Sequence, residues 1–325
     1  MNYRRMLQWP GNHTAFVFSD PAGANACIGF AKLGKELNER SSILFCNKKY
    51  NDDTVENLHV VNTVPEFNKL GIDCVFTGTS HPESSGYFEI DCIKAASKQG
   101  IRTISFIDHW VNFKLRFLDG NGQTFFPDEI WVVDEKAKEL ALKEGLPENK
   151  LVIHPNPYHE YLRLLWKPVY TNKDYLDTLS IPKTGRHVLF APDPLSIRDE
   201  KKLAGFTEDE ALSDICEVIN DLGNEVHLVV KCHPLQPVET LKKVIKDRKG
   251  VYLVKNADPL ELINASDLIV GFYSNLLLEA EAMEKQVTRY FPGNENADLL
   301  NHNNSLEKAV TPKELSIKLK HHLHG

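Results

Sequence analysis

The segment from Val229 to Pro234 carries the first residues with clear chemical potential. An apolar run ends at Lys231 and His233, and Pro234 then prevents the strand from continuing. Such a strand end places an ammonium group and an imidazole N–H at one edge of a sheet, where both can donate to a phosphate oxygen. The segment therefore predicts an anion-binding site. The alternative is a histidine that only caps a strand end.

A second anion-binding feature lies about 40 residues further along the chain. The predicted strand 267–270 turns through Gly271 into a helical pattern whose first turn holds Ser274 and Asn275. The unpaired N–H groups and the positive dipole end of a helix attract anions, and a serine hydroxyl adds a donor. Glu279 follows on the same helix, where a carboxylate could accept from ribose hydroxyls. The alternative is an ordinary N-cap on an amphipathic helix, with Glu279 in solvent.

Short apolar runs that alternate with helical patterns must position these residues. Runs at 14–18, 42–46, 73–76, 101–107 and 130–133 predict strands in the first half. Helical patterns lie near 27–37, 62–70, 87–99 and 136–144, the last one between an N-cap at Asp134 and a stop at Gly145. Strands separated by helices and buried on both faces predict a parallel sheet with right-handed crossovers.

The chain changes character between residues 155 and 186, where prolines alternate with aromatic residues, and the α/β pattern then restarts at 187. We therefore predict two α/β domains that face a cleft, where ligands usually bind. The predicted parts are an N-terminal domain, a connecting segment, a C-terminal domain, and a last helix that crosses back towards the first domain: 1–160, 161–186, 187–304 and 305–325.

Composition excludes several classes of protein. The 325 residues carry a net charge of −7 without a long basic run, which argues against a nucleic-acid partner. No apolar stretch approaches a membrane span, and the N-terminus lacks the apolar core of a secretory signal, so we expect a cytoplasmic protein. Membrane association would then require a partner. The six cysteines form no C-x-x-C pair and the histidines no H-E-x-x-H, so we expect free buried thiols and no metal site.

Several familiar signatures are missing from the sequence. It has no G-x-G-x-x-G after a strand, no G-x-x-x-x-G-K-[ST], and no G-x-S-x-G. It also lacks a D-x-D at a strand end, which holds the diphosphate-bound metal in one architecture of glycosyltransferases. These absences favour a metal-independent mechanism over nucleotide hydrolysis by a P-loop or acyl transfer by a serine hydrolase.

Residues 258–287 resemble the donor half of GT-B glycosyltransferases and of the related UDP-GlcNAc 2-epimerases. Those enzymes typically show a strand, a small-residue turn, Ser, then Glu-Ala and a Gly-Lys-Pro-Val-like run; here Glu284 and Gln286 replace the usual Gly and Pro. The pair His233-Pro234 is similar to the His-Pro motif of bacterial sialyl-, polysialyl- and glycerol-phosphate transferases. The resemblance covers roughly residues 187–292. It implies a GT-B fold of two Rossmann-like domains, in which His233 and Ser274 hold the donor phosphate and Glu279 the ribose.

The first domain would then bind the acceptor, through three polar segments that each follow an apolar strand. The residues are Asp20 and Asn25, then Thr79 and Ser80, then Asp108, His109 and Trp110 with Arg116 close behind. Glycosyl transfer with inversion needs a base for the acceptor hydroxyl, and Asp108 is our first candidate and His109 our second, with Asp20 and Glu83 in reserve. Alternatively, Asp108 caps a helix. Trp110, Phe113 or Phe117 could stack on a sugar, or simply pack in the core.

Together these patterns predict a metal-independent glycosyltransferase that moves a sugar from a CMP-, CDP- or UDP-linked donor to a surface glycan, without a further cofactor. Positioning and stabilisation of the departing phosphate would drive the reaction. Two alternatives remain open: an enzyme similar to UDP-GlcNAc 2-epimerases, and a non-catalytic nucleotide-sugar-binding protein of polysaccharide assembly. The choice of nucleotide and the stereochemical course cannot be read from these residues.

Overall fold

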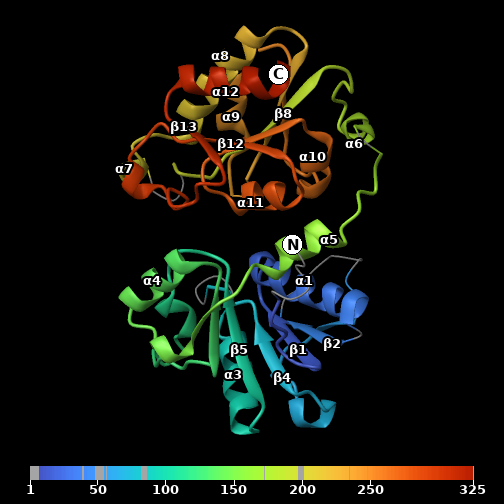
Figure 1. The fold of residues 1–325 in the computed structure, drawn as a ribbon, viewed down its shortest axis with the longest axis vertical. Helices are drawn as coiled ribbons and strands as arrows, with labels where there is room; N and C mark the ends of the chain where they lie inside the picture. The colour runs from blue at the N-terminus through green and yellow to red at the C-terminus, as the bar shows by residue number, and fades with distance from the viewer. Residues whose placement is uncertain are drawn as a thin grey trace. The chain divides into compact units, whose positions relative to one another are not determined.

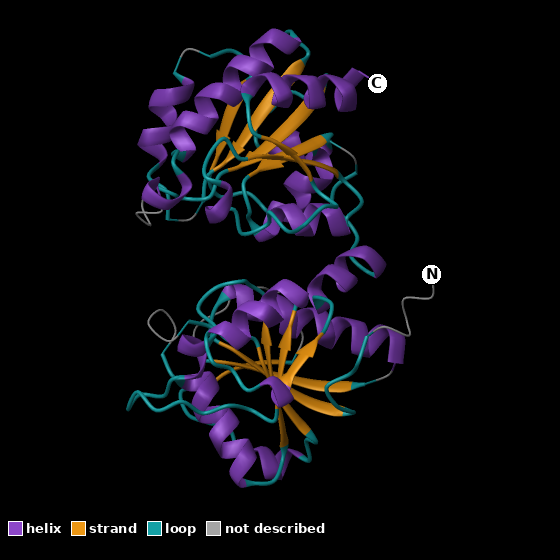
Figure 2. Ribbon diagram, turned by 60° about the vertical axis from the view of Figure 1, so that its left-hand side comes forward, coloured by secondary structure: helices purple, strands orange, loops and turns teal. Residues whose placement is uncertain are grey.

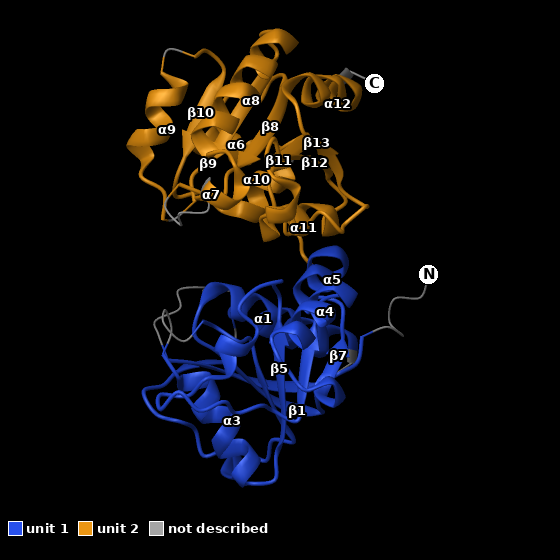
Figure 3. Ribbon diagram, turned by 90° about the vertical axis from the view of Figure 1, so that its left-hand side faces the viewer, with its two compact units in different colours: residues 1–165 blue, residues 166–325 orange. Residues whose placement is uncertain are grey.

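The alternation of strands and helices produces two separate parallel sheets in a computed structural model of the chain (Figure 1). The structure describes residues 7–38, 40–47, 55, 57–81, 86–171, 173–196, 201–233, 235–246 and 248–324. The chain divides into two compact units, residues 1–165 and 166–325 (Figure 3). The division falls inside the segment 161–186 that we expected to connect the domains.

Unit 1 is built on a seven-stranded sheet in the order β3-β2-β1-β4-β5-β6-β7, with every neighbouring pair parallel. Its strands are β1 His13–Phe18, β2 Ser41–Cys46, β3 Leu58–Val60, β4 Cys74–Thr77, β5 Arg102–Ile107, β6 Glu129–Val132 and β7 Leu151–Ile153. Its helices are α1 Pro21–Asn38, η2 Phe67–Leu70, α3 Phe88–Lys98, η3 Lys114–Phe117, α4 Glu135–Lys143, η4 Glu148–Lys150 and α5 Pro157–Leu164.

Helices cover both faces of this sheet (Figure 2), and the side chains of β1 show why. Phe16 and Phe18 point into the core cluster beneath α1, whereas Ala15 and Val17 point into the cluster beneath α3. Successive residues of a strand face opposite sides, so a strand covered on both sides must be apolar throughout. This is the continuous apolar run from which the sequence predicts a buried parallel strand.

Unit 2 contains a six-stranded parallel sheet in the order β10-β9-β8-β11-β12-β13. Its strands are β8 Arg186–Ala191, β9 Val226–Lys231, β10 Val251–Val254, β11 Leu268–Gly271, β12 Gln286–Tyr290 and β13 Glu307–Ala309. Its helices are α6 Asp174–Thr178, α7 Lys201–Ala204, α8 Glu208–Leu222, α9 Val238–Ile245, α10 Pro259–Ala265, α11 Asn275–Ala282, η5 Glu295–Ala297 and α12 Pro312–His324.

Each sheet reverses its strand order once. The reversal lies between β1 and β4 in unit 1, and between β8 and β11 in unit 2. In open parallel sheets of this kind, the loops at the carboxyl ends of the two strands diverge at the reversal and leave room for a ligand. The predicted fold of two Rossmann-like α/β domains is therefore confirmed, and the loops beside these two reversals are where a functional site is expected.

Some predicted elements differ from the structure. The last helix, expected to cross back towards the first domain, packs within unit 2, because Leu315, Leu319 and Leu323 are buried where α12 meets α8, β12 and β13. The helical pattern near 62–70 is only the single turn η2. The edge strands β3, β7 and β13 were not predicted, because three residues are too few to show a period. All six cysteines are free and buried, as expected.

Candidate functional site

The candidate phosphate-binding residues of unit 2 lie on the loops that follow three neighbouring strands. His233 follows β9 and Ser274 follows β11, and the loop 192–196 after β8 lies between them, because β8 is the strand between β9 and β11. Asp193 of that middle loop accepts the Tyr273 N–H at 3.4 Å. The reversal of strand order therefore brings the two anion-binding motifs of the sequence to one edge of one sheet.

His233 is held in one defined state. Its Nδ1 accepts the N–H of Leu235 at 3.2 Å, in a tight turn closed by the Gln236 N–H donating to the His233 carbonyl at 2.9 Å. Because Nδ1 acts as an acceptor, the neutral ring carries its proton on Nε2. Nε2 is thus the donor that the imidazole can offer to a phosphate oxygen. Pro234 itself lies outside the described residues.

Ser274 is the N-cap of α11 and accepts the Leu276 N–H at 3.3 Å, while Asn275 is the first residue of the helix. Both alternatives of the sequence analysis are therefore compatible with its position, since a capping serine still presents its hydroxyl proton beside the first N–H groups of the helix. Glu279 lies half-buried one turn further on. A helix that starts in this way can receive an anion at its first turn.

Lys231 and Glu279 are close enough to influence each other. Burial is the main cause of a lowered pKa at Lys231, and the charges of Glu279 and Asp258 act in the opposite direction. An ammonium group that is partly desolvated at a strand end attracts anions more strongly than one in water. The structure thus brings together Lys231, the strand end of His233, and the helix that carries Glu279.

A buried ion pair supports the loop that leads to Ser274. Arg289 on β12 is 1% exposed, and it donates to the carbonyl of Phe272 at 3.0 Å and to that of Leu300 at 2.9 Å. Its remaining guanidinium nitrogen pairs with the Asp298 carboxylate. Phe272 lies two residues before Ser274, so this arginine fixes the backbone at the start of α11.

The carboxyl edge of unit 1 brings together the loops after β1 and β4. Asp20 accepts the Gly23 N–H at 2.8 Å, and the backbone of Gly23 lies against that of Gly78, where a Cβ atom added to Gly78 would approach Gly23 within 2.3 Å. Only glycine permits this contact between the two loops. Next to it, Thr79 has a positive φ of 51° and donates to the Phe106 carbonyl at 2.5 Å.

Arg116 and Glu89 complete this edge. Arg116 donates to the Thr79 carbonyl, and both oxygens of Glu89 lie 3.2 Å from the Ser80 nitrogen. Glu89 is 6% exposed, and burial raises its pKa to about 7. The negative charge of Asp20 also raises this pKa, whereas the hydrogen bonds from Ser80 lower it. Asp20, Thr79, Ser80 and Arg116 were predicted from sequence, whereas Glu89 was not.

The predicted catalytic segment follows β5, the neighbour of β4, so Asp108 and His109 belong to the same edge of unit 1. Asp108 is buried and His109 lies against the Trp110 ring. Trp110 is also buried, and its indole N–H donates to the carboxylate of Asp134 at 3.0 Å. Phe113 and Phe117 are fully buried as well. The packing alternative therefore describes these aromatic residues, and none of the three offers an exposed ring to a sugar.

Sequence reasoning missed the residues that hold the site together. Asp193, Glu208, Gln236 and Glu89 are all buried polar side chains near the carboxyl edges of the two sheets. The one signal available was their polarity next to apolar runs, which does not separate a buried side chain from a solvated one. Asn25 lies half-buried near the start of α1, and Glu83 lies outside the described residues.

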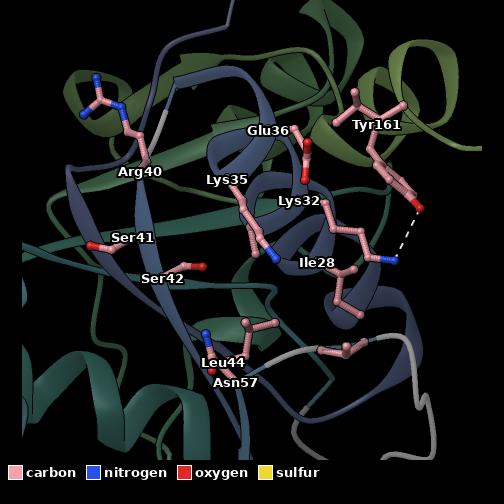
Figure 4. Close-up of a pocket in the computed structure, with 13 residues that line it drawn as sticks. Ile28, Lys32, Lys35, Glu36, Arg40, Ser41, Ser42, Leu44, Asn57 and Tyr161 are labelled. Carbon is pink, nitrogen blue, oxygen red and sulfur yellow. Dashed lines mark hydrogen bonds between the residues drawn. The ribbon is translucent and has the colours of Figure 1, made fainter.

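A cavity of about 550 Å³ lies elsewhere in unit 1 (Figure 4). Residues of α1, α5 and the start of β2 line most of it, and Lys32 points towards Tyr161, to whose hydroxyl it donates at 3.3 Å. Because Ser41 and Ser42 begin β2, the cavity lies towards the amino end of that strand, away from the loop of Asp20. It is not part of the candidate site.

Among the residues that the structure describes, no three His, Cys, Asp or Glu side chains gather as a metal centre would require. Within the same described ranges, no helix combines the length and apolar character needed to cross a bilayer.

No protein-family model and no curated protein sequence matches the chain. Solved structures do. A putative UDP-N-acetylglucosamine 2-epimerase from Listeria monocytogenes is similar over 97% of this chain and 88% of its own, with 14% identity and a TM-score of 0.67. The UDP-GlcNAc 2-epimerase from Methanocaldococcus jannaschii is similar over 96% and 93%, at 13% identity and a TM-score of 0.60.

Alr3699/HepE from Anabaena, solved in complex with UDP-glucose, is similar over 95% of this chain and 89% of its own, with 11% identity and a TM-score of 0.61. At such low identities the likeness shows the fold. The neighbours have the GT-B-like arrangement of two α/β domains, and those solved in complexes hold UDP, UDP-GlcNAc or UDP-glucose.

Proposed function

We propose that this chain is an enzyme that breaks the bond between C1 of a sugar and the phosphate of a nucleoside diphosphate. The observation that carries the proposal is the convergence of anion donors at the reversal of the unit 2 sheet. The Nε2–H of His233, the ammonium group of Lys231 and the first turn of α11 at Ser274 belong to one edge. The UDP-sugar complexes of structures with the same fold support a uridine nucleotide.

In this proposal, unit 2 stabilises the leaving group. His233 and Ser274 donate to the diphosphate oxygens, Lys231 balances their charge, and Glu279 accepts from the ribose hydroxyls. When the C1–O bond breaks, the electron pair stays on the diphosphate, and donors already aimed at that charge lower the barrier. Neither metal nor further cofactor enters the proposed step.

Unit 1 binds the sugar and any acceptor in this proposal. Asp20, Asn25, Thr79 and Ser80 provide polar groups for hydroxyls, and Asp108 or His109 takes up the proton. In a glycosyl transfer, that proton comes from the acceptor hydroxyl, whose oxygen forms the new bond to C1 as the diphosphate leaves. The acceptor is a surface glycan, and the reaction takes place in the cytoplasm.

Epimerisation of the sugar is a second candidate, because several structures with the same fold are UDP-GlcNAc 2-epimerases. Nuclear magnetic resonance of UDP-GlcNAc incubated with the protein alone separates the candidates. An epimerase changes the sugar signals without any acceptor, whereas a transferase leaves the substrate intact until an acceptor is added. Binding of the nucleotide sugar without turnover under either condition would contradict both the transferase and the epimerase proposal.

The nucleotide site itself is tested by a thermal-shift and calorimetric titration with UDP, CDP, CMP and GDP. At a hundredfold excess over Kd, a ligand stabilises the native state by about 2.7 kcal/mol. We expect UDP to bind most tightly and His233→Ala to weaken UDP binding about tenfold, because one hydrogen bond to a charged group is lost. The exposed His59 in unit 1 provides a control, and His59→Ala should bind UDP like the native protein. Equal affinity of His233→Ala and native protein for UDP would remove the observation on which the proposal depends.

A further inference from the structure

A chain of hydrogen bonds, centred on two buried side chains, ties the loop after β8 to the loop after β9. Its centre is Glu208, the first residue of α8, whose side chain is 1% exposed. The Glu208 carboxylate accepts the N–H of Ser196 at 2.9 Å and the hydroxyl of Ser196 at 2.5 Å. It also accepts the side-chain amide of Gln236 at 3.2 Å. Glu208 thus joins residues 40 positions apart in the sequence.

Gln236 carries this connection to His233. Its side chain is 2% exposed, and its Oε1 accepts the His233 N–H at 3.3 Å while its backbone N–H donates to the His233 carbonyl at 2.9 Å. The backbone of His233 is therefore clamped on both sides by one residue. With Nδ1 occupied by the Leu235 N–H, the imidazole has one orientation and one neutral tautomer.

Stability alone is a weak reason to bury these polar groups. Burial of a carboxylate costs free energy that well-packed apolar side chains would not cost, and hydrogen bonds only offset it when every group is satisfied. Here three donors and the amino end of α8 offset the charge of Glu208. What such a network adds is a fixed backbone geometry, and the residue whose backbone it holds is His233.

We propose that Gln236, held by Glu208, is a positioning residue that sets the Nε2–H of His233 towards the diphosphate of the substrate. This inference rests on the proposed function, because it gives His233 a phosphate to bind. It assigns Glu208 and Gln236 an indirect role, because in this proposal neither residue touches the substrate. The loop after β8 links the same network to Asp193 and Tyr273, next to Ser274.

A double-mutant cycle tests whether Gln236 acts through His233. We expect Gln236→Ala to raise the Kd for UDP about tenfold in calorimetry. In a His233→Ala background, the same Gln236→Ala change should alter the Kd less than twofold, because the ring that it positions is gone. Gln286→Ala, at an exposed glutamine of β12, serves as the matched control and should leave the Kd unchanged. A tenfold effect that persists in the His233→Ala background would overturn the positioning role.

A second measurement does not depend on UDP. In the ¹⁵N spectrum of histidine-labelled protein, we expect the His233 Nδ1 to be unprotonated in the native chain and a mixture of tautomers in Gln236→Ala. Glu208→Gln keeps the shape of the network and should fall between them. If His233→Ala binds UDP normally, the proposed function fails, and the spectrum still decides the positioning role. Identical tautomers in native protein and Gln236→Ala would refute it.

Discussion

Replacing Glu89 by glutamine is expected to make unit 1 more stable than the native chain at alkaline pH, by a margin that grows between about pH 5 and pH 8. Burial raises the pKa of Glu89 from its ordinary value of 4.5 to about 7 in the folded state. Between these values the folded protein binds more protons than the unfolded one, so the free energy of unfolding falls as pH rises. From pH 5 to pH 8 this amounts to about 2–3 kcal/mol, and Glu89→Gln removes it.

Urea unfolding at several pH values measures this difference. Tryptophan fluorescence reports mainly on unit 1, because three of the four tryptophans, Trp9, Trp110 and Trp131, belong to it. Glu139→Gln is the control: the pKa of Glu139 is lowered to about 2 by Lys143 and Lys136, so this carboxylate does not titrate between pH 5 and pH 8. A constant difference between Glu89→Gln and native protein over that range would show that Glu89 is ionised throughout.

Asp20→Asn is a companion variant for the same titration. The charge of Asp20 contributes to the raised pKa of Glu89, and asparagine caps a helix about as well as aspartate does. Asp20→Asn should therefore lower the pH at which Glu89 titrates while α1 keeps its first turn. The two loops beside the reversal in unit 1 would then be shown to share an electrostatic environment.

The fold could be predicted from sequence because its strongest determinant is local. A strand such as β1 is apolar at every position since both of its faces are covered, and a turn and a helix follow it at once. That signal recurs through both units. It failed at β3, β7 and β13, where three residues at a sheet edge carry no period. The prediction for α12 also differed from the structure. The apolar face of an amphipathic helix indicates that the helix packs against the protein, but it does not indicate which surface it packs against.

The site could be predicted only in part. Lys231, His233 and Ser274 were singled out as candidates because each follows an apolar run directly, and the carboxyl end of a parallel strand is a defined place. Glu89, Glu208 and Gln236 were not, because each belongs to a helix or turn whose sequence is that of an ordinary surface. Their burial arises largely from contacts with segments 9 to 28 residues away in the chain. Such contacts leave no local pattern.

Arg289 is the clearest example of a residue whose role cannot be read from the neighbouring sequence. Of the changes considered, we expect Arg289→Met to reduce the free energy of unfolding most. Methionine matches the length of the apolar stem, but it removes the buried cation of the Asp298 carboxylate and leaves only Lys308, at 3.6 Å, to balance that charge. It also leaves the carbonyls of Phe272 and Leu300 without their donor. Breaking a buried pair in this way typically costs about 3–5 kcal/mol. Urea unfolding, monitored by hydrogen exchange in peptides from β11 and β12, measures the loss of stability in unit 2.

The double variant Arg289→Met with Asp298→Leu separates the charge from the packing. The double variant has no buried carboxylate that requires a cation, so it should recover much of the stability that Arg289→Met loses. It should not restore UDP affinity, since the Phe272 carbonyl still lacks the Arg289 donor that fixes the backbone ahead of Ser274. Recovery of both stability and UDP binding would mean that the pair only fills space. Recovery of stability alone would show that the buried arginine holds the turn before Ser274 in the geometry that UDP binding requires.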